Sequence, residues 1–177
     1  MGGQSFGNWS VTDDYGSFQG ETKIVPFLKA PGFCSTQTSS LFRADASAFA
    51  KGSIQIVART TTPEYTGFKL SMGAPGIPHH SGGHEILGSY KANFTVPAGT
   101  DFSTVTIPMD MFSWDWSDFT GNCFTKDPTG YQHKCCSDSS DRCPTASELG
   151  KIISMQVWAE GVAGVFHLDI KSISASD

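Results

Sequence analysis

The sequence predicts an all-β fold, a sandwich of two packed sheets with at most one or two short helices. Apolar and polar residues alternate in several short runs, which is the pattern of strands that bury one face. Nineteen glycines and nine prolines are spread along the whole length, as expected for a chain with many turns. A bundle of long helices would be depleted in both residue types, so we expect helix to be minor.

The alternation predicts eight strands, which are enough for two sheets. They span residues 18–27, 33–38, 53–59, 67–72, 87–94, 104–107, 152–158 and 165–173. In the clearest of them Ile54, Ile56 and Ala58 face one way. Gln55 and Arg59 face the other way, so one face of this strand belongs to the core.

The last predicted strand repeats this pattern with a slip in phase. Phe166, Leu168 and Ile170 share one face, and Ile173 returns to that face after the slip. His167 stands on the opposite face, so we interpret it as a solvated sheet residue in preference to a ligand.

Turn and helix signals separate the strands. Pro and Gly mark breaks at 30–32, 62–63, 73–78 and 97–99. Only two segments favour helix: residues 44–49, as a turn ahead of a strand, and residues 144–149. In the second, Thr145 is the expected N-cap and Glu148 completes a capping box.

Composition and charge limit the function. A chain of 177 residues with 38% hydrophobic and 16% charged content can bury one full core, so we predict a single domain over 1–177. The net charge of −5, without any Lys/Arg cluster, argues against nucleic-acid binding and polybasic membrane anchoring. No run reaches the roughly 18–20 apolar residues that span a bilayer. The chain starts without a leader, and we expect Met1 to be an internal residue of a longer precursor.

Short motifs follow one another along nearly the whole chain. They are 1–5 (MGGQS), 18–20 (FQG), 32–35 (GFCS), 46–52 (ASAFAKG), 68–70 (FKL), 89–92 (SYKA), 105–108 (VTIP) with Phe112, and 165–170 (VFHLDI). In this order they resemble the CIA30 family, the domain of the complex I intermediate-associated protein.

The resemblance implies a jelly-roll sandwich of the galactose-binding type, in which Phe33, Tyr90, Ile107 and Phe166 would fill the space between the sheets. It implies no catalytic activity, no cofactor, and a role as an accessory or assembly protein of a large organellar membrane complex. The family normally has an aromatic and acidic strand just before the Met-Gly-Gly. This chain lacks that strand, so we expect an upstream strand or a targeting segment to be missing.

A polar insertion at about 117–148 departs from the family pattern and carries four of the five cysteines, Cys123, Cys135, Cys136 and Cys143. In one interpretation, two disulfides stabilise a loop that is too poor in apolar residues to stay folded, which requires an oxidising compartment. We therefore expect an oxidising organellar space such as the thylakoid lumen, with a mitochondrial or a secreted location as alternatives.

In the other interpretation, the same cysteines and His133 form a mixed zinc site. The insertion has no Cys-x-x-Cys pair and its spacings are irregular, which favours disulfides. A bridge between adjacent Cys135 and Cys136 is the least comfortable geometrically, so we favour Cys123 with one of them and Cys143 with the other. Cys34, inside a strand, is expected to stay a buried thiol.

A row of aromatic residues at 112–119 supplies the candidate binding residues, Phe112, Trp114, Trp116 and Phe119. Rings interleaved with acidic and polar groups are typical of a sugar-stacking platform or of a protein-binding patch. The same rings would also suit packing of the insertion onto the sandwich.

Two further polar clusters are weaker candidates for metal binding. Three imidazoles and a carboxylate fall within seven residues, but the spacing matches no metal motif known to us, and we interpret it as a loop. These residues are His79, His80, His84 and Glu85. The acidic residues Asp13 and Asp14, and Asp138 and Asp141, could coordinate calcium, but solvated acidic turns are the more common explanation.

The resemblance to the CIA30 family therefore implies a non-catalytic accessory or assembly protein, with no cofactor. Its partners would be protein subunits of a membrane electron-transfer complex of the mitochondrial complex I type or of a photosynthetic complex in a plastid. It would be peripheral to the membrane and held there by those proteins. The alternative is a secreted carbohydrate-binding module of the same fold, whose partner is a glycan.

Overall fold

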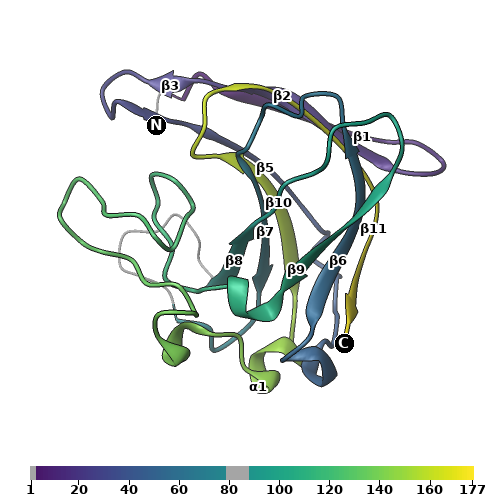
Figure 1. Ribbon diagram of the computed structural model, residues 1–177, viewed down its shortest axis with the longest axis vertical. Helices are drawn as coiled ribbons and strands as arrows, with labels where there is room; N and C mark the ends of the chain where they lie inside the picture. The colour runs from purple at the N-terminus through teal and green to yellow at the C-terminus, as the bar shows by residue number, and fades with distance from the viewer. Residues whose placement is uncertain (1–2, 79–87) are drawn as a thin grey trace.

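The computed structural model describes residues 3–78 and 88–177, and its main feature is a pair of antiparallel sheets packed face to face (Figure 1). The first sheet has the strand order β1-β2-β11-β6-β9, and the second has the order β5-β10-β7-β8. The predicted all-β sandwich is therefore confirmed. The strands are β1 (Phe6–Val11), β2 (Gly16–Thr22), β3 (Ile24–Val25), β4 (Ala30–Pro31), β5 (Phe33–Gln37), β6 (Ser53–Thr60), β7 (Phe68–Gly73), β8 (Ser89–Asn93), β9 (Ser103–Pro108), β10 (Ser154–Glu160) and β11 (Gly164–Ser176).

The eight predicted strands have counterparts in the structure, with one correction at 18–27. The chain leaves the first sheet after Thr22, and a separate hairpin of β3 and β4 follows. Strand β1 was not predicted. It pairs along its whole length with β2, from Phe6 opposite Glu21 to Val11 opposite Gly16, but all of its residues are exposed. Because β1 buries no face, it carries no alternation that would mark it as a strand.

The core lies between the two sheets and is built largely of rings. Phe18 of β2 and Phe166 of β11 contact each other at a centroid distance of 4.8 Å, and Tyr65 and Phe68 add to this cluster. Ile54, Ile56 and Ala58 face the same core from β6, with at most 3% of each residue exposed, as the alternation predicts.

A β-bulge in β11 explains the slip in phase that the sequence indicates. Ile170 pairs with Ala58 of β6, but the next registered pair is Ser172 with Val57, so Lys171 is the extra residue. The bulge returns Ile173 to the core side, where it packs against the buried cluster.

Tyr90, Ile107 and Phe166 lie in the core as expected, but the same expectation is wrong for Phe33. Those three residues are at most 2% exposed, whereas Phe33 is 44% exposed. Cys34 takes the core position on β5 instead, as the free buried thiol that was expected, and burial raises its pKa. Phe33 consequently lies on the outer face of its sheet.

His167 is less solvated than its alternation suggests. Its side chain is 26% exposed, and its Nε2 lies 3.1 Å from Asp169 Oδ1. Its two ring nitrogens also contact the hydroxyls of Ser17 and Thr61, so it joins β2, β11 and the loop after β6.

Regular helix is limited to one short element, α1 (Ala146–Leu149), in the described part of the chain, with three 3-10 turns: η1 (Ser47–Phe49), η2 (Met109–Met111) and η3 (Ser140–Arg142). Thr145 is the N-cap of α1 as predicted, and its hydroxyl accepts a hydrogen bond from the Glu148 amide. The Glu148 carboxylate accepts bonds from the hydroxyls of Thr145 and Tyr90, so it ties the helix to β8. Among the described residues, no helix has both the length and the apolar character needed to cross a bilayer.

Phe166 should be far more sensitive to substitution than its neighbour on the strand. We expect Phe166→Ala to lower the free energy of unfolding by about 3–5 kcal/mol, because it leaves a cavity among three rings. Val165→Ala, at a position that is 61% exposed, should change it by less than about 0.5 kcal/mol. Urea unfolding measures both values, and equal effects of the two substitutions would contradict this assignment of the core.

Candidate functional site

The outer face of the four-stranded sheet carries a dense set of polar, charged and aromatic side chains. Alternation places them there, because the residues between them on each strand face the core. The residues of this outer face are Phe33, Ser35 and Gln37 on β5, Gln156, Trp158 and Glu160 on β10, Lys69 and Ser71 on β7, and Ser89, Lys91 and Asn93 on β8.

Strand register sets which of these side chains are neighbours. Gln156 stands opposite Gln37 on one side and opposite Ser71 on the other. In the next row, Trp158 lies between Ser35 and Lys69. The face therefore alternates hydrogen-bonding groups with a large ring, within one layer of the sheet.

A buried ion pair lies at one side of this face. Lys91 Nζ is 2.7 Å from Glu160 Oε1, and the two side chains are 0% and 7% exposed. The ammonium also lies 3.5 Å from the ring centroid of Trp116 and 3.8 Å from that of Trp158. The pair is thus enclosed between two indole rings, where its attraction is little screened by water.

Lys69 is a second buried lysine, two residues into β7. It is 2% exposed, and burial lowers its pKa to about 8, partly offset by the nearby Glu160 carboxylate. Within the part of the chain that the structure describes, the Lys69 ammonium has no hydrogen bond or ion pair. No carboxylate of the described residues therefore forms an ion pair with Lys69.

The cysteine-rich insertion covers part of this face. Backbone hydrogen bonds join Ser113 to Lys91 in both directions, which adds a bridge at the edge of β8. Further along, a Cβ on Gly121, whose φ is +69°, would lie 2.1 Å from Glu160 Oε1 and 2.6 Å from Lys69 Cε. Only glycine fits this approach, because both the backbone conformation and the space exclude a side chain.

Two disulfides hold the insertion, as predicted, and they follow the favoured pairing. Cys123 is bonded to Cys135, and Cys136 is bonded to Cys143. Disulfides of this kind persist in an oxidising compartment. The zinc alternative is wrong for these four cysteines, because every one of their sulfurs is part of a disulfide bond.

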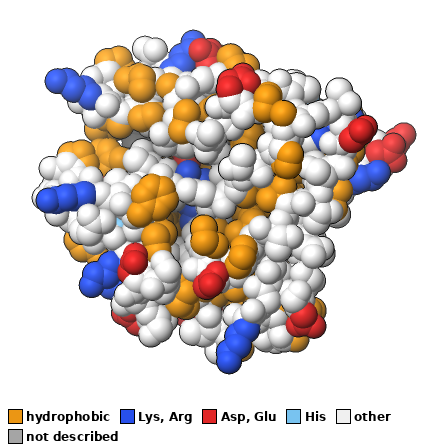
Figure 2. Space-filling view, viewed as in Figure 1, with side chains coloured by type: hydrophobic (Ala, Val, Ile, Leu, Met, Phe, Trp, Pro, Cys, Tyr) orange, Lys and Arg blue, Asp and Glu red, His pale blue; other side chains and the backbone are white. Residues whose placement is uncertain are grey.

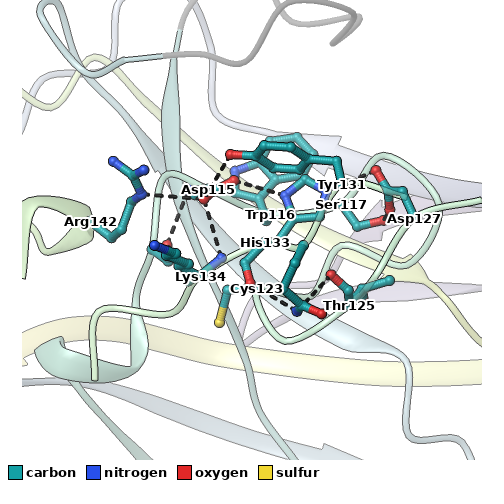
Figure 3. A network of polar contacts seen from close by, with 12 residues as sticks. Asp115, Trp116, Ser117, Cys123, Thr125, Asp127, Tyr131, His133, Lys134 and Arg142 are labelled. Atoms are coloured by element: carbon teal, nitrogen blue, oxygen red, sulfur yellow. Dashed lines mark hydrogen bonds and ion pairs between the residues drawn. The ribbon is translucent and has the colours of Figure 1, made fainter. Parts of the chain in front are cut away.

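A network of ionic contacts adds to the disulfides (Figure 3). His133 is the centre of it: Nδ1 lies 2.8 Å from Asp115 Oδ1, and Nε2 lies 2.8 Å from Asp127 Oδ2. An ionised carboxylate only accepts hydrogen bonds, so both contacts are satisfied when the ring is an imidazolium. Arg142 donates to the second oxygen of Asp115, whose side chain is 0% exposed. His133, the remaining residue of the predicted zinc site, therefore has both ring nitrogens in contact with carboxylates.

Of the four predicted aromatic residues, Trp114 contacts the insertion and Trp116 packs on the sheet face beside it. Phe112 is 0% exposed and belongs to the core, so its expected place in a surface row is wrong. Trp116 is 6% exposed, donates its indole N–H to the Ser89 carbonyl, and covers Lys91. Trp114 is half-buried, donates to the Asp141 carbonyl and stacks with Arg142, and Phe119 is also half-buried.

The other predicted metal candidates gain no support. His79, His80, His84 and Glu85 lie outside the described residues. Among residues 3–78 and 88–177, no group of three or more His, Cys, Asp or Glu side chains is arranged to hold a metal ion.

The uncovered half of the outer face lies toward β5. Phe33 stands against Trp158 at a centroid distance of 5.4 Å, and Trp158 donates its indole N–H to Ser71 Oγ at 3.0 Å. Ser35 and Gln37 beside them are exposed, and Gln156 is half-buried. Figure 2 shows a hollow with Lys or Arg side chains at its bottom, between the β3–β4 hairpin and the insertion as these are placed in Figure 1. Lys69 and Lys91 are the basic residues of this sheet face.

A different cavity, of about 630 Å³, opens at the edge where the two sheets part, and it is mostly apolar. Trp9, Phe42, Met155 and Ile173 are among its lining residues. With few polar groups in its walls, it suits a ligand with hydroxyl groups less well than the outer face does.

Comparison with known proteins supports the fold. No family model matches this sequence, and no curated protein matches it. The structure of PfGH50B is similar, with a TM-score of 0.53 and 16% identity, over 97% of this chain and 22% of that one. An agarase, AgWH50C, and an exo-β-agarase are each similar with a TM-score of 0.53 and 9% identity, over 100% of this chain and 23% of theirs. The chain thus spans less than a quarter of these proteins, and at such identities the likeness shows the fold alone.

The Lys91–Glu160 pair should be costly to break from one side. We expect Glu160→Gln to lower the free energy of unfolding by about 3–5 kcal/mol, because it leaves a buried ammonium without its carboxylate. The double variant Glu160→Gln with Lys91→Met should be closer to the wild type than Glu160→Gln alone. Urea unfolding of the single and double variants tests this coupling. If the losses in unfolding free energy of Glu160→Gln and Lys91→Met simply added in the double variant, the coupling would be disproved.

Lys69 should make stability depend on pH. Its pKa is about 8 in the folded protein against 10.5 for the free side chain, so the unfolded chain binds more protons between these values. The contribution of this residue to stability is therefore unfavourable below about pH 8 and improves as pH rises from 8 toward 10.5. Unfolding in urea at several pH values should show this rise, and Lys69→Met should reduce its slope.

Proposed function

We propose that this chain is a non-catalytic carbohydrate-binding module, which holds a saccharide in the hollow on the outer face of the β5-β10-β7-β8 sheet. The observation that carries the proposal is the combination on that face of an exposed ring with hydrogen-bonding side chains. Phe33 backs onto Trp158, while Ser35, Gln37 and Gln156 flank the two rings. A sugar has both an apolar C–H face and a rim of hydroxyls, so it fits a surface of this kind.

The comparisons support this reading over the accessory role, although only at the level of fold. Two of the similar structures are agarases, so a sandwich of this kind occurs within proteins that act on a polysaccharide. Fold does not determine function, and the argument for binding therefore rests on the side chains of the hollow.

Absence of catalysis is part of the proposal. Glu160, the one carboxylate of the described outer face, is engaged by Lys91 at 2.7 Å. Glycoside hydrolysis commonly needs a pair of carboxyl groups about 5–10 Å apart, one of them free to donate a proton. A paired and enclosed Glu160 suits a structural task better.

The disulfides indicate an oxidising space, and a secreted or lumenal location fits a protein that binds a polysaccharide.

The accessory role on a membrane redox complex, implied by the resemblance to the CIA30 family, is the second candidate. One feature favours it: the β3–β4 hairpin exposes three large apolar side chains. Ile24 is 48% exposed, Phe27 is 71% exposed and Leu28 is 47% exposed. Grouped apolar side chains of this kind are typical of a surface that a protein partner covers.

Substitution of Phe33 separates the two candidates. We expect Phe33→Ala to weaken saccharide binding about tenfold, on the order of 1.4 kcal/mol, because the stacking ring is lost. The matched control is Phe6→Ala, which removes a ring of similar exposure, 59%, from the other sheet. Isothermal titration with the best ligand from a glycan array, agarose oligosaccharides included, measures both affinities.

Two outcomes would contradict the carbohydrate proposal. One is that no glycan is retained, while native co-purification recovers a protein partner and Phe27→Ala abolishes its binding. The other is that Phe33→Ala and Phe6→Ala weaken saccharide binding equally. Both variants are first compared with the wild type by thermal unfolding, so that loss of fold is not mistaken for loss of binding.

A further inference from the structure

We propose that Lys69 gives this face a preference for acidic saccharides, whose sulfate or carboxylate group contacts the Lys69 ammonium at the bottom of the hollow. The inference rests on the proposed carbohydrate-binding function and names the ligand class for the same face. It is carried by three features: the location of Lys69, the charge balance around it, and its lack of a partner.

The charge balance leaves one positive charge on the covered side of the face. The charged groups packed near Lys69 are Glu160, from β10, and Lys91, from β8. Because Lys91 and Glu160 form an ion pair with each other at 2.7 Å, their charges largely cancel. The charge of Lys69 remains, and it faces the same layer of the sheet as Trp158 and Asn93.

A buried ammonium without a partner is an unfavourable choice for packing alone. The stem of Lys69 would fill its space equally well as methionine, which carries no charge to desolvate. In the described part of the chain the Lys69 ammonium makes no hydrogen bond or ion pair, so its three N–H donors have no protein acceptor there. An ionised oxygen is the group that matches them best, because hydrogen bonds between charged partners are the strongest.

Access is the remaining requirement. Figure 2 shows Lys or Arg side chains at the bottom of a hollow. Only 2% of Lys69 is exposed, so an acidic group would reach its ammonium only over this small exposed area. The rest of the face supplies neutral donors and acceptors: Ser35, Gln37 and Gln156 lie on the two strands nearest β7 on that side. A sugar ring stacked on Phe33 would meet these groups with its hydroxyls, and an acidic substituent would extend toward Lys69.

The test compares neutral and acidic oligosaccharides of similar length. The probes are an agarose tetrasaccharide, which is a neutral galactan, a κ-carrageenan tetrasaccharide, which is a sulfated galactan, and a tetragalacturonate, which carries carboxylates. Affinities are measured by isothermal titration at pH 7 and at pH 9.5, at constant ionic strength, because surface charges are screened by salt. The sulfated and the carboxylated probes distinguish the two sources of the acidic group.

We expect at least one acidic probe to bind the wild type about tenfold more tightly than the neutral one, and this preference to fall at pH 9.5. The fall follows from the titration of Lys69, whose pKa of about 8 makes it largely neutral at the higher pH. Lys69→Met should remove the preference at pH 7 and leave the affinity for the neutral probe unchanged. It should also fold with equal or greater stability, whereas a purely structural role would make it less stable.

Lys126→Met is the matched control, since it makes the same change of net charge at an exposed lysine of the insertion. If Lys69→Met and Lys126→Met lost the acidic preference equally, the preference would come from the net charge of the protein, and the role of Lys69 would be overturned. The role of Lys69 is also overturned if the wild type shows no acidic preference. In that case the proposed carbohydrate binding still stands, provided that the neutral probe binds and Phe33→Ala weakens its binding. If no probe binds, both the role of Lys69 and the proposed function fail. Should Lys69→Met not fold, the pH dependence of the wild-type preference still decides.

Discussion

The enclosed ion pair between Lys91 and Glu160 is the interaction on which the distinctive half of this structure depends. It links β8 to β10 across β7, on a sheet face that would otherwise be open to water. Such a pair is stable only if its desolvation is offset by close partners, and here Trp116 and Trp158 supply them on either side. Trp158 belongs to the sheet, whereas Trp116 directly precedes the insertion, and Gly121 of the insertion packs against Glu160, so the enclosure of the pair depends on the folded insertion.

That requirement explains the strength with which the insertion is held. The segment is polar and could not maintain a fixed shape through burial of apolar area alone. Two short disulfide loops and the contacts of His133 with Asp115 and Asp127 hold it instead, and Gly121 allows its backbone to approach Glu160 closely. Fixing the cover in this way leaves the β5 side of the same sheet free, which is where Phe33 is exposed.

Features set by local sequence could be predicted, and features set by the fold of distant segments could not. Strand β6, the bulge of β11 and the N-cap of α1 follow from residues within a few positions of one another. In contrast, Lys69 and Lys91 alternate with core residues and would be taken as solvated. Their burial depends on the insertion, which follows them by about thirty to fifty residues in the chain. Phe33 is expected in the core for a different reason. It lies on an edge strand, and the residues next to it in sequence do not show which face of that strand is turned outward.

The same reasoning indicates where specificity resides in this protein. The sandwich fold is similar to that of the compared structures at only 9–16% identity, so the fold by itself does not select a ligand. The hollow is different, because its charge and its walls come from side chains of the outer sheet face and from the insertion beside it. If the insertion were removed, the Lys91–Glu160 pair would be open to water, and Lys69 would be screened like any surface lysine. In the proposed mode of binding, the insertion thus does more than stabilise the sandwich: it would make the charge of Lys69 strong enough to influence which ligand is bound.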